Sequence, residues 1–129
     1  MKKYFVTGSE GFIGSSLVEK LLEKKNVVFA LVNYNSFGNI GWLRKLSLKN
    51  KRLKVIFGDL KDPDTFLDYL SKSDYVINLA SLISVPYSYS ASKSYLENNI
   101  LGCHFLYSSC KKLKIKKIIH ISSSEVYGT

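Results

Sequence analysis

The stretch "VTGSEGFIGSSL" at residues 6–17 decides the fold, because it places three glycines between a run typical of a strand and a run typical of a helix. Gly8, Gly11 and Gly14 let the chain turn tightly, let backbone N–H groups approach a pyrophosphate, and let the helix start pack against a sheet. Two residues separate the first two glycines, where the commonest fingerprint has one. The position of the stretch, after a strand and before an apolar helix, favours a dinucleotide-binding loop over a plain turn.

Short runs rich in β-branched and aromatic residues recur along the chain, and we expect a strand in each of them: residues 3–7, 27–33, 53–58, 75–80 and 116–122. Apolar residues at helical spacing lie between these runs, at 15–25, 62–72 and 95–113. The second helix should begin at "DPD", with Asp62 as its N-cap and Pro63 at the first helical position. Strands alternating with helices predict an α/β fold: a Rossmann-type doubly wound parallel sheet, truncated after the fifth strand.

The composition is that of one ordered globular domain, with 129 residues, 46% of them hydrophobic and 22% charged. No apolar run approaches the ~20 residues that span a bilayer, and the glycine-rich turn comes too early for a signal peptide. We therefore expect a cytoplasmic protein with no membrane partner. The net charge of +9 rests on lysines apart from Arg44 and Arg52, whereas nucleic-acid readers rely on arginine. A solvated basic surface is predicted, and no nucleic-acid partner.

The cysteines and histidines give no sign of a disulfide or a metal site. Cys103 and Cys110 fall within one predicted helix, about 10 Å apart and beyond disulfide reach, so we expect reduced thiols in the core. His104 and His120 have no neighbour at a metal-ligand spacing, and we interpret both as structural.

Five motifs, in order along the chain, resemble those of the extended short-chain dehydrogenase/reductases, the NAD-dependent epimerase/dehydratase family that acts on nucleotide sugars. They are "VTGSEGFIG" at 6–14, "GDL" at 58–60, "NLAS" at 78–81, "NNILG" at 98–102 and "ISSSEVYG" at 121–128. Five ordered motifs are much more specific than a glycine pattern alone. The resemblance implies that a dinucleotide is bound by Thr7, Gly8, Gly11, Phe12, Ile13, Gly14, Asn33, Ser36, Asp59, Leu60, Leu79, Ala80, Ser81 and Asn99. Of these, Asp59 and Leu60 match the family's adenine contact.

The end of the second strand bears on the choice of cofactor. An NAD-binding member usually has Asp or Glu there to accept a hydrogen bond from the ribose 2′-hydroxyl, but this chain has Asn33. An amide can still bond a 2′-hydroxyl and does not repel a 2′-phosphate, while Ser36 and Arg44 could favour that phosphate. We expect NAD and keep NADP as the alternative.

The strand-five motif bears on the reaction. By resemblance the active-site hydroxyl belongs to Ser123, with Ser124 and Glu125 after it, and Glu125 matches the base of sugar 4,6-dehydratases and also a glutamate of UDP-glucuronate decarboxylases. In a dehydratase, oxidation at C4 acidifies the C5 proton, a carboxylate removes it as the C6 hydroxyl departs, and the hydride returns to C6. Some 4,6-dehydratases carry Asp at the position of Ser124, so Glu125 would serve both proton transfers here.

Two further segments resemble dehydratases that act on nucleotide-linked N-acetylglucosamine in legionaminic acid biosynthesis. They are "YNSFGNIGWL" at 34–43 and residues 80–102. The resemblance implies a GDP- or UDP-linked N-acetylglucosamine as the substrate. The aromatic residues of the first segment, Tyr34, Phe37 and Trp42, have a simpler interpretation as loop residues packed against the sheet.

A tyrosine and a lysine four residues apart occur at "YSASK", residues 89–93. By resemblance, the catalytic Tyr-x-x-x-Lys pair should follow Ser123, and Tyr89 and Lys93 precede it. We therefore interpret them as loop residues and expect residues 1–129 to be an incomplete NAD(P)-binding Rossmann domain without the sugar-binding region. Such a chain should have little dehydratase activity alone, and its fifth strand should form an open sheet edge. Full-length relatives are expected to be homodimers.

Three hypotheses about function remain open on the sequence. The first is the N-terminal part of a nucleotide-sugar 4,6-dehydratase, with an epimerase or decarboxylase of the same family as its variant. The second is a non-catalytic NAD(P)-binding module, because the glycine loop alone supports binding. The third is a basic nucleic-acid-binding domain, which would leave the ordered motifs unexplained.

Overall fold

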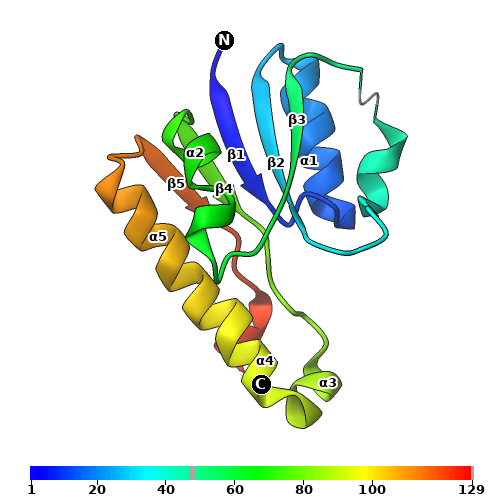
Figure 1. Cartoon of the computed structure of the whole chain (residues 1–129). Coiled ribbons are helices and arrows are strands. Elements are labelled where there is room, and N and C mark those ends of the chain that lie inside the picture. The colour runs from blue at the N-terminus through cyan, green and yellow to red at the C-terminus, as the bar shows by residue number, and fades with distance from the viewer. Residues whose placement is uncertain (47–48, 129) are drawn as a thin grey trace.

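The computed structural model describes residues 1–46 and 49–128 of the chain. Its centre is a single parallel sheet with the strand order β3-β2-β1-β4-β5 (Figure 1). The strands are β1 (Lys3–Thr7), β2 (Val27–Asn33), β3 (Leu53–Gly58), β4 (Tyr75–Asn78) and β5 (Lys117–His120). The predicted Rossmann-type doubly wound sheet is confirmed, and so are its five strands, although β4 and β5 are shorter than expected.

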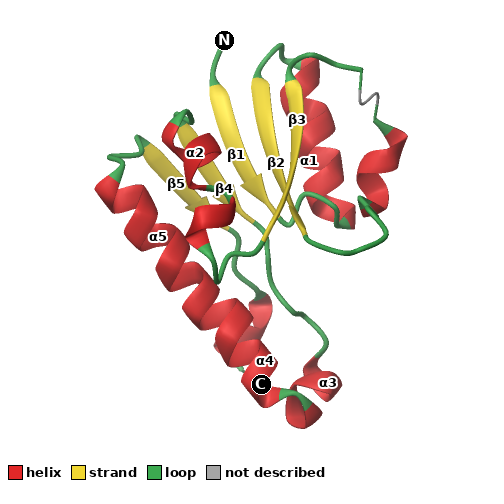
Figure 2. Cartoon of the chain, viewed as in Figure 1, coloured by secondary structure: helices red, strands yellow, loops and turns green. Residues whose placement is uncertain are grey.

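Helices cover both faces of the sheet because successive side chains of each strand point to opposite sides (Figure 2). Val6 of β1 packs toward α1 (Phe12–Glu23) and the 3₁₀ helix η1 (Gly41–Lys45). Its neighbour Phe5 packs toward α2 (Leu67–Ser71) and α5 (Gly102–Lys112). The two layers form two apolar cores, and the sheet separates them.

The second predicted helix differs from the expectation. Residues 62–72 form a 3₁₀ turn, η2 (Pro63–Thr65), followed by the short helix α2. Pro63 does take the first helical position, but the Asp62 side chain makes no capping bond. The Thr65 hydroxyl instead donates to the Asp62 carbonyl at 2.7 Å. This bond of the tight turn occupies the Asp62 carbonyl, which at a regular helix start would accept a backbone hydrogen bond.

The third predicted helix is longer than expected and is not uniform. It comprises α4 (Ser92–Tyr95), the π-helical segment η3 (Leu96–Leu101) and α5. Short π segments inside helices are rare and are frequent at functional sites. Gly102 follows η3, and a Cβ there would lie 3.2 Å from Leu60 Cβ, so the helix passes close to the turn after β3.

The "YSASK" stretch is helical, because α3 (Val85–Ser90) and α4 hold Tyr89 and Lys93 in two consecutive short helices. Tyr34, Phe37 and Trp42 are 70%, 95% and 57% exposed, so packing against the sheet does not account for them.

Strand β5 is the edge of the sheet beyond β4, as the sequence predicted. Its four residues are all exposed, and Ile119, which pairs in register with Ile77, is 44% exposed. After the strand, Ile121 N–H donates to the Asn78 carbonyl at 3.1 Å, and the short 3₁₀ helix η4 (Ser124–Tyr127) follows. In the described part of the chain, β5 therefore pairs with one neighbouring strand only, β4.

Among the described residues, Cys103 and Cys110 are both free thiols, and Cys103, expected in the core, is only half-buried. Cys110 is buried, and burial raises its pKa to about 11. The same residues contain no group of three His, Cys, Asp or Glu side chains that could hold a metal ion. None of the helices within them is long and apolar enough to cross a bilayer.

Phe66 offers a test of the core on the α5 side of the sheet. Its side chain is 1% exposed, and its ring centroid lies 5.6 Å from that of Phe5. Phe66→Ala should lower the free energy of unfolding by about 3–5 kcal/mol, measured by urea denaturation followed by circular dichroism. The matched control is Phe37→Ala, because Phe37 is 95% exposed and its loss should change stability by less than about 0.5 kcal/mol. Equal effects of the two substitutions would contradict this assignment of the core.

Candidate functional site

The glycine loop connects the end of β1 to the start of α1 and has the close packing that its sequence predicted. Gly8 has a φ of +63°, and a Cβ there would lie 2.8 Å from the Leu79 carbonyl carbon. A Cβ on Gly14 would lie 2.1 Å from the Gly8 carbonyl oxygen. Gly11, in extended conformation, is the N-cap of α1 and provides no side chain to cap it. The first backbone N–H groups of α1 are therefore open to an anion such as a pyrophosphate.

Thr7 fastens the glycine loop to the neighbouring strand at the centre of the sheet. Its buried hydroxyl donates to Asn78 Oδ1 and accepts from the N–H groups of Leu79 and Ala80, both at 3.1 Å. The hydroxyl is thus fully used within the protein. Because β1 and β4 lie where the strand order reverses, the clamp fixes both walls of the crevice in which open α/β sheets bind their ligands.

A cavity of about 490 Å³ lies beyond the end of β2, lined by Glu10, Val32, Asn33, Tyr34, Asn35, Phe37, Asn39, Gly41 and Arg44. Asn33 is the residue expected to read the ribose, and it does line this cavity. Ser36 lies on the same loop and is exposed, but it is not among the lining residues. The sequence prediction missed Glu10, whose carboxylate accepts a hydrogen bond from Asn33 N–H at 3.2 Å. The only hint of this role in the sequence was that Glu10 is an acidic residue between two glycines of the loop.

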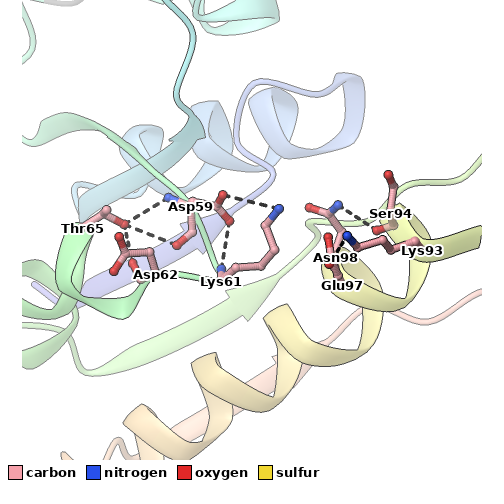
Figure 3. Close-up of polar contacts among 8 residues, drawn as sticks. All are labelled: Asp59, Lys61, Asp62, Thr65, Lys93, Ser94, Glu97 and Asn98. Atoms are coloured by element: carbon pink, nitrogen blue, oxygen red, sulfur yellow. Dashed lines mark hydrogen bonds and ion pairs between the residues drawn. The ribbon is translucent and has the colours of Figure 1, made fainter. Parts of the chain in front are cut away.

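Asp59 and Leu60, expected to contact adenine, form the turn after β3 (Figure 3). The Asp59 carboxylate accepts from Lys61 N–H at 2.9 Å, and Lys61 Nζ lies 3.7 Å from it. Thr65 supports the turn, because Asp59 N–H donates to the Thr65 hydroxyl at 3.0 Å. Figure 3 shows the Lys61 side chain pointing toward the helical segment that carries Asn98. The Asp59 side chain is 40% exposed and therefore keeps acceptor capacity for a ligand amino group.

Asn99 lies in the π-helical segment η3 and has a structural partner. Its side-chain amide accepts from Leu82 N–H and donates to the Leu82 carbonyl, both at 2.9 Å. This two-way bond holds the segment that follows β4, where the predicted contacts Leu79, Ala80 and Ser81 lie. Asn99 therefore positions the wall of the crevice, and its contact with a dinucleotide stays a prediction.

The remaining predicted cofactor contacts, Phe12 and Ile13, form the first turn of α1. They are 69% and 64% exposed, which is unusual for large apolar residues at the start of a buried helix. The Phe12 ring meets the Trp42 ring edge to face, with centroids 5.7 Å apart. These side chains give the crevice an apolar rim beside the open N–H groups of α1.

The predicted catalytic residues Ser123, Ser124 and Glu125 follow β5 and are all exposed. Ser123 Oγ accepts from Glu125 N–H at 3.1 Å, a bond that fixes the backbone at the start of η4. Within residues 1–46 and 49–128, no hydrogen bond joins these residues to the glycine loop. They share with it the carboxyl edge of the parallel sheet, where ligands of such folds bind.

Tyr89 and Lys93 do not form a proton-transfer pair in this arrangement. Tyr89 is 85% exposed, and Lys93 lies 3.7 Å from Glu97 within its own helical segment. No hydrogen bond between the two occurs in the described part of the chain, in agreement with their non-catalytic interpretation.

A row of polar groups runs behind the crevice and was not predicted as a network. Asn78 Nδ2 donates to the Tyr107 hydroxyl at 2.9 Å and to Cys103 Sγ at 3.3 Å, and the Tyr107 hydroxyl in turn contacts His120 Nδ1. Burial raises the pKa of Tyr107. The row connects the Thr7 clamp to the end of β5, from which the chain continues to Ser123. The only hint of this network in the sequence was Asn78, a polar residue at the end of the apolar strand "YVIN".

Comparison with known proteins gives a consistent family match. The family model described as GDP-mannose 4,6 dehydratase matches residues 5–129. A dTDP-D-glucose 4,6-dehydratase from Dictyostelium discoideum is 36% identical over 136 residues, which covers 100% of this chain and 30% of that protein. The chain spans 30% to 39% of the length of this relative and of the Protein CapI of Staphylococcus aureus.

Solved structures agree with the fold. A UDP-N-acetylglucosamine 4-epimerase from Methanobrevibacter ruminantium, in complex with UDP-N-acetylmuramic acid, is 41% identical with a TM-score of 0.85, covering 98% of this chain and 39% of that one. A dTDP-glucose 4,6-dehydratase from Streptomyces venezuelae, with NAD bound, is 27% identical with a TM-score of 0.89, covering 98% and 41%. Dehydratases and epimerases are thus both similar to this chain.

The close contact at Gly14 can be tested by substitution. Gly14→Ala places a methyl group against the Gly8 carbonyl oxygen and should lower the free energy of unfolding by about 1–3 kcal/mol, because the loop must shift. Gly11→Ala is the control, since a Cβ there would lie 3.4 Å from the same oxygen and should cost about 1 kcal/mol or less. Urea denaturation measures both. A Gly14→Ala protein as stable as the parent would contradict the described loop geometry.

Proposed function

Because the chain belongs to the GDP-mannose 4,6-dehydratase family, a group of nucleotide-sugar dehydratases and epimerases within the extended short-chain dehydrogenase/reductases, we propose that it is the N-terminal, NAD-binding part of a nucleotide-sugar 4,6-dehydratase. The bound NAD of the Streptomyces venezuelae relative supports the cofactor assignment. The residues present fit a dinucleotide: open N–H groups at α1, a cavity beyond β2, and an exposed acceptor at Asp59.

The observation that carries the dehydratase assignment is Glu125, a carboxylate two residues after Ser123 beyond the end of β5, in a turn closed by the bond from Glu125 N–H to the Ser123 hydroxyl. A carboxylate this near in sequence to the active-site hydroxyl serves no purpose in simple transfer of a hydride, but an elimination requires a base for the C5 proton. We assign to Ser123 a hydrogen bond to the C4 oxygen of the sugar. Glu125 would then remove the C5 proton and return it to the departing C6 hydroxyl as water forms.

A bound nicotinamide would supply hydride chemistry at C4 and C6 of the sugar, and a solvent proton would replace the one lost from C5. The chain's own part is to hold that ring in place. The Thr7 clamp and the Asn99–Leu82 bond keep the segment after β4 still, and the apolar rim of Phe12 and Ile13 excludes water from one side of the crevice. The role of each of these residues toward the cofactor is part of the proposal.

For the substrate we propose a GDP- or UDP-linked N-acetylglucosamine. The resemblance of residues 34–43 and 80–102 to enzymes of that specificity supports it, as does the epimerase relative that is named for UDP-N-acetylglucosamine. The same relative, at 41% identity, favours a second candidate function: 4-epimerisation of such a sugar. In that case Glu125 would have no part in proton transfer at C5.

Binding of NAD can be tested on the chain itself. Isothermal titration with NAD⁺ should give saturable binding, and Asp59→Ala should weaken it by about tenfold because an adenine contact is lost. Asp64→Ala is the matched control, since Asp64 is an exposed carboxylate of the neighbouring 3₁₀ turn and removes the same charge. Absence of saturable binding to the parent chain at millimolar NAD⁺ would refute the proposal.

The reaction can be tested on a full-length protein that carries this chain. Incubation with nucleotide-linked N-acetylglucosamine in deuterated water should give a product that has lost one water and gained deuterium at C5, as seen by mass spectrometry and NMR. Glu125→Gln should reduce this turnover by about 10²–10⁴-fold, whereas Glu23→Gln, an exposed residue at the far end of α1, should not. A product of unchanged mass with an inverted C4 would identify an epimerase instead.

A further inference from the structure

Glu10 has an unusual environment for a carboxylate. One of its oxygens, Oε1, accepts from Asn33 N–H at 3.2 Å. The other, Oε2, is shielded from solvent and has no hydrogen-bond partner among the described residues. A buried acceptor without a donor costs free energy, and such groups in native proteins commonly await a ligand, ion or water. Glu10 also lines the cavity beyond β2, so its negative charge acts on any group that enters this cavity.

The position of Glu10 is fixed by the loop that packs on it. Trp42 N–H donates to the Glu10 carbonyl at 3.0 Å, and Gly41, with a φ of +53°, leaves no room for a side chain there because a Cβ would lie 2.5 Å from the same oxygen. Asn35 and Asn39 close the loop with two reciprocal bonds of 2.7 Å. The wall that presents the carboxylate is therefore built before any ligand arrives.

We infer that Glu10 selects the cofactor, by accepting a hydrogen bond from the 2′-hydroxyl of the adenosine ribose and by repelling a 2′-phosphate, so that the chain prefers NAD to NADP. This inference rests on the proposed binding of a dinucleotide. Asn33, at the end of β2, is uncharged and cannot provide that repulsion. Glu10 reaches the same cavity from the glycine loop and brings the negative charge that β2 lacks.

Arg44 is the opposing charge in this cavity and would attract a phosphate. Its side chain is exposed, and no ion pair holds it to an acidic residue within residues 1–46 and 49–128. Water and salt therefore screen it strongly. The Glu10 carboxylate is anchored by Asn33 N–H and partly buried, so its field acts at lower effective dielectric. The carboxylate should dominate the choice between the two cofactors.

The test compares the affinities of the parent chain for NAD⁺ and NADP⁺, measured by the fluorescence of Trp42, the single tryptophan, and by titration calorimetry. Glu10→Gln keeps an oxygen that can accept from Asn33 N–H but removes the charge. We expect the parent chain to prefer NAD⁺ and the variant to lower the NAD⁺/NADP⁺ affinity ratio by about tenfold, mainly through tighter NADP⁺ binding. Arg44→Gln should act in the opposite direction, by weakening NADP⁺ binding.

Asn33→Asp is a second, independent variant. In the Glu10→Gln background it places a carboxylate on β2 at the same cavity and should restore the preference for NAD⁺. Circular dichroism and thermal melting establish that each variant is folded. A parent chain without preference, or an unchanged ratio in Glu10→Gln, would overturn the inference while NAD⁺ binding, and with it the proposed function, still stands. Failure of the parent chain to bind either dinucleotide would overturn both.

Discussion

The hydroxyl of Thr7 is the contact on which the rest of the site depends. It binds Asn78 and two N–H groups after β4, and so joins the two central strands at the point where the strand order reverses. The glycine loop and the polar row behind the crevice both begin at this junction. The glycine loop leaves β1 directly after Thr7, and the close approach of Gly8 to Leu79 is compatible only with strands held at this spacing. On the other side, the Asn78 side chain donates to the Tyr107 hydroxyl, which in turn contacts His120 at the end of β5.

Much of the fold follows from local sequence pattern, and the departures from it have separate physical causes. The strands at 3–7, 27–33 and 53–58 have the predicted bounds, because buried parallel strands are continuous apolar runs. Residues 62–72 did not form a regular helix, since the Thr65 hydroxyl and the turn at Asp59 take the bonds of its first turn. The sequence left open whether Phe37 and Trp42 pack on the sheet, because an apolar composition does not reveal whether a loop turns toward the core or away from it, and both are exposed.

The candidate site was predictable where it depends on a motif and was missed where it depends on contacts between distant segments. The glycine positions were identified from their spacing between a strand and a helix, and Asp59 from the resemblance of "GDL" to a family motif. Glu10 was not, because its significance arises only when the loop containing Gly41 folds over it and the end of β2 comes alongside. Asn99 was identified as a motif residue, but its partner Leu82 shows that it holds another segment in place. The identity of a motif residue therefore does not reveal whether it touches a ligand or supports a residue that does.

The strand order has a consequence for the way the molecule is made. β1 lies in the middle of the sheet, with β2 and β3 added on one side and β4 and β5 on the other, so the sheet grows outward from its first strand. During synthesis, which proceeds from the N-terminus, both residues of the junction between Thr7 and Asn78 are made before any residue of β5. The last strand therefore adds to an edge whose own residues all come earlier in the chain.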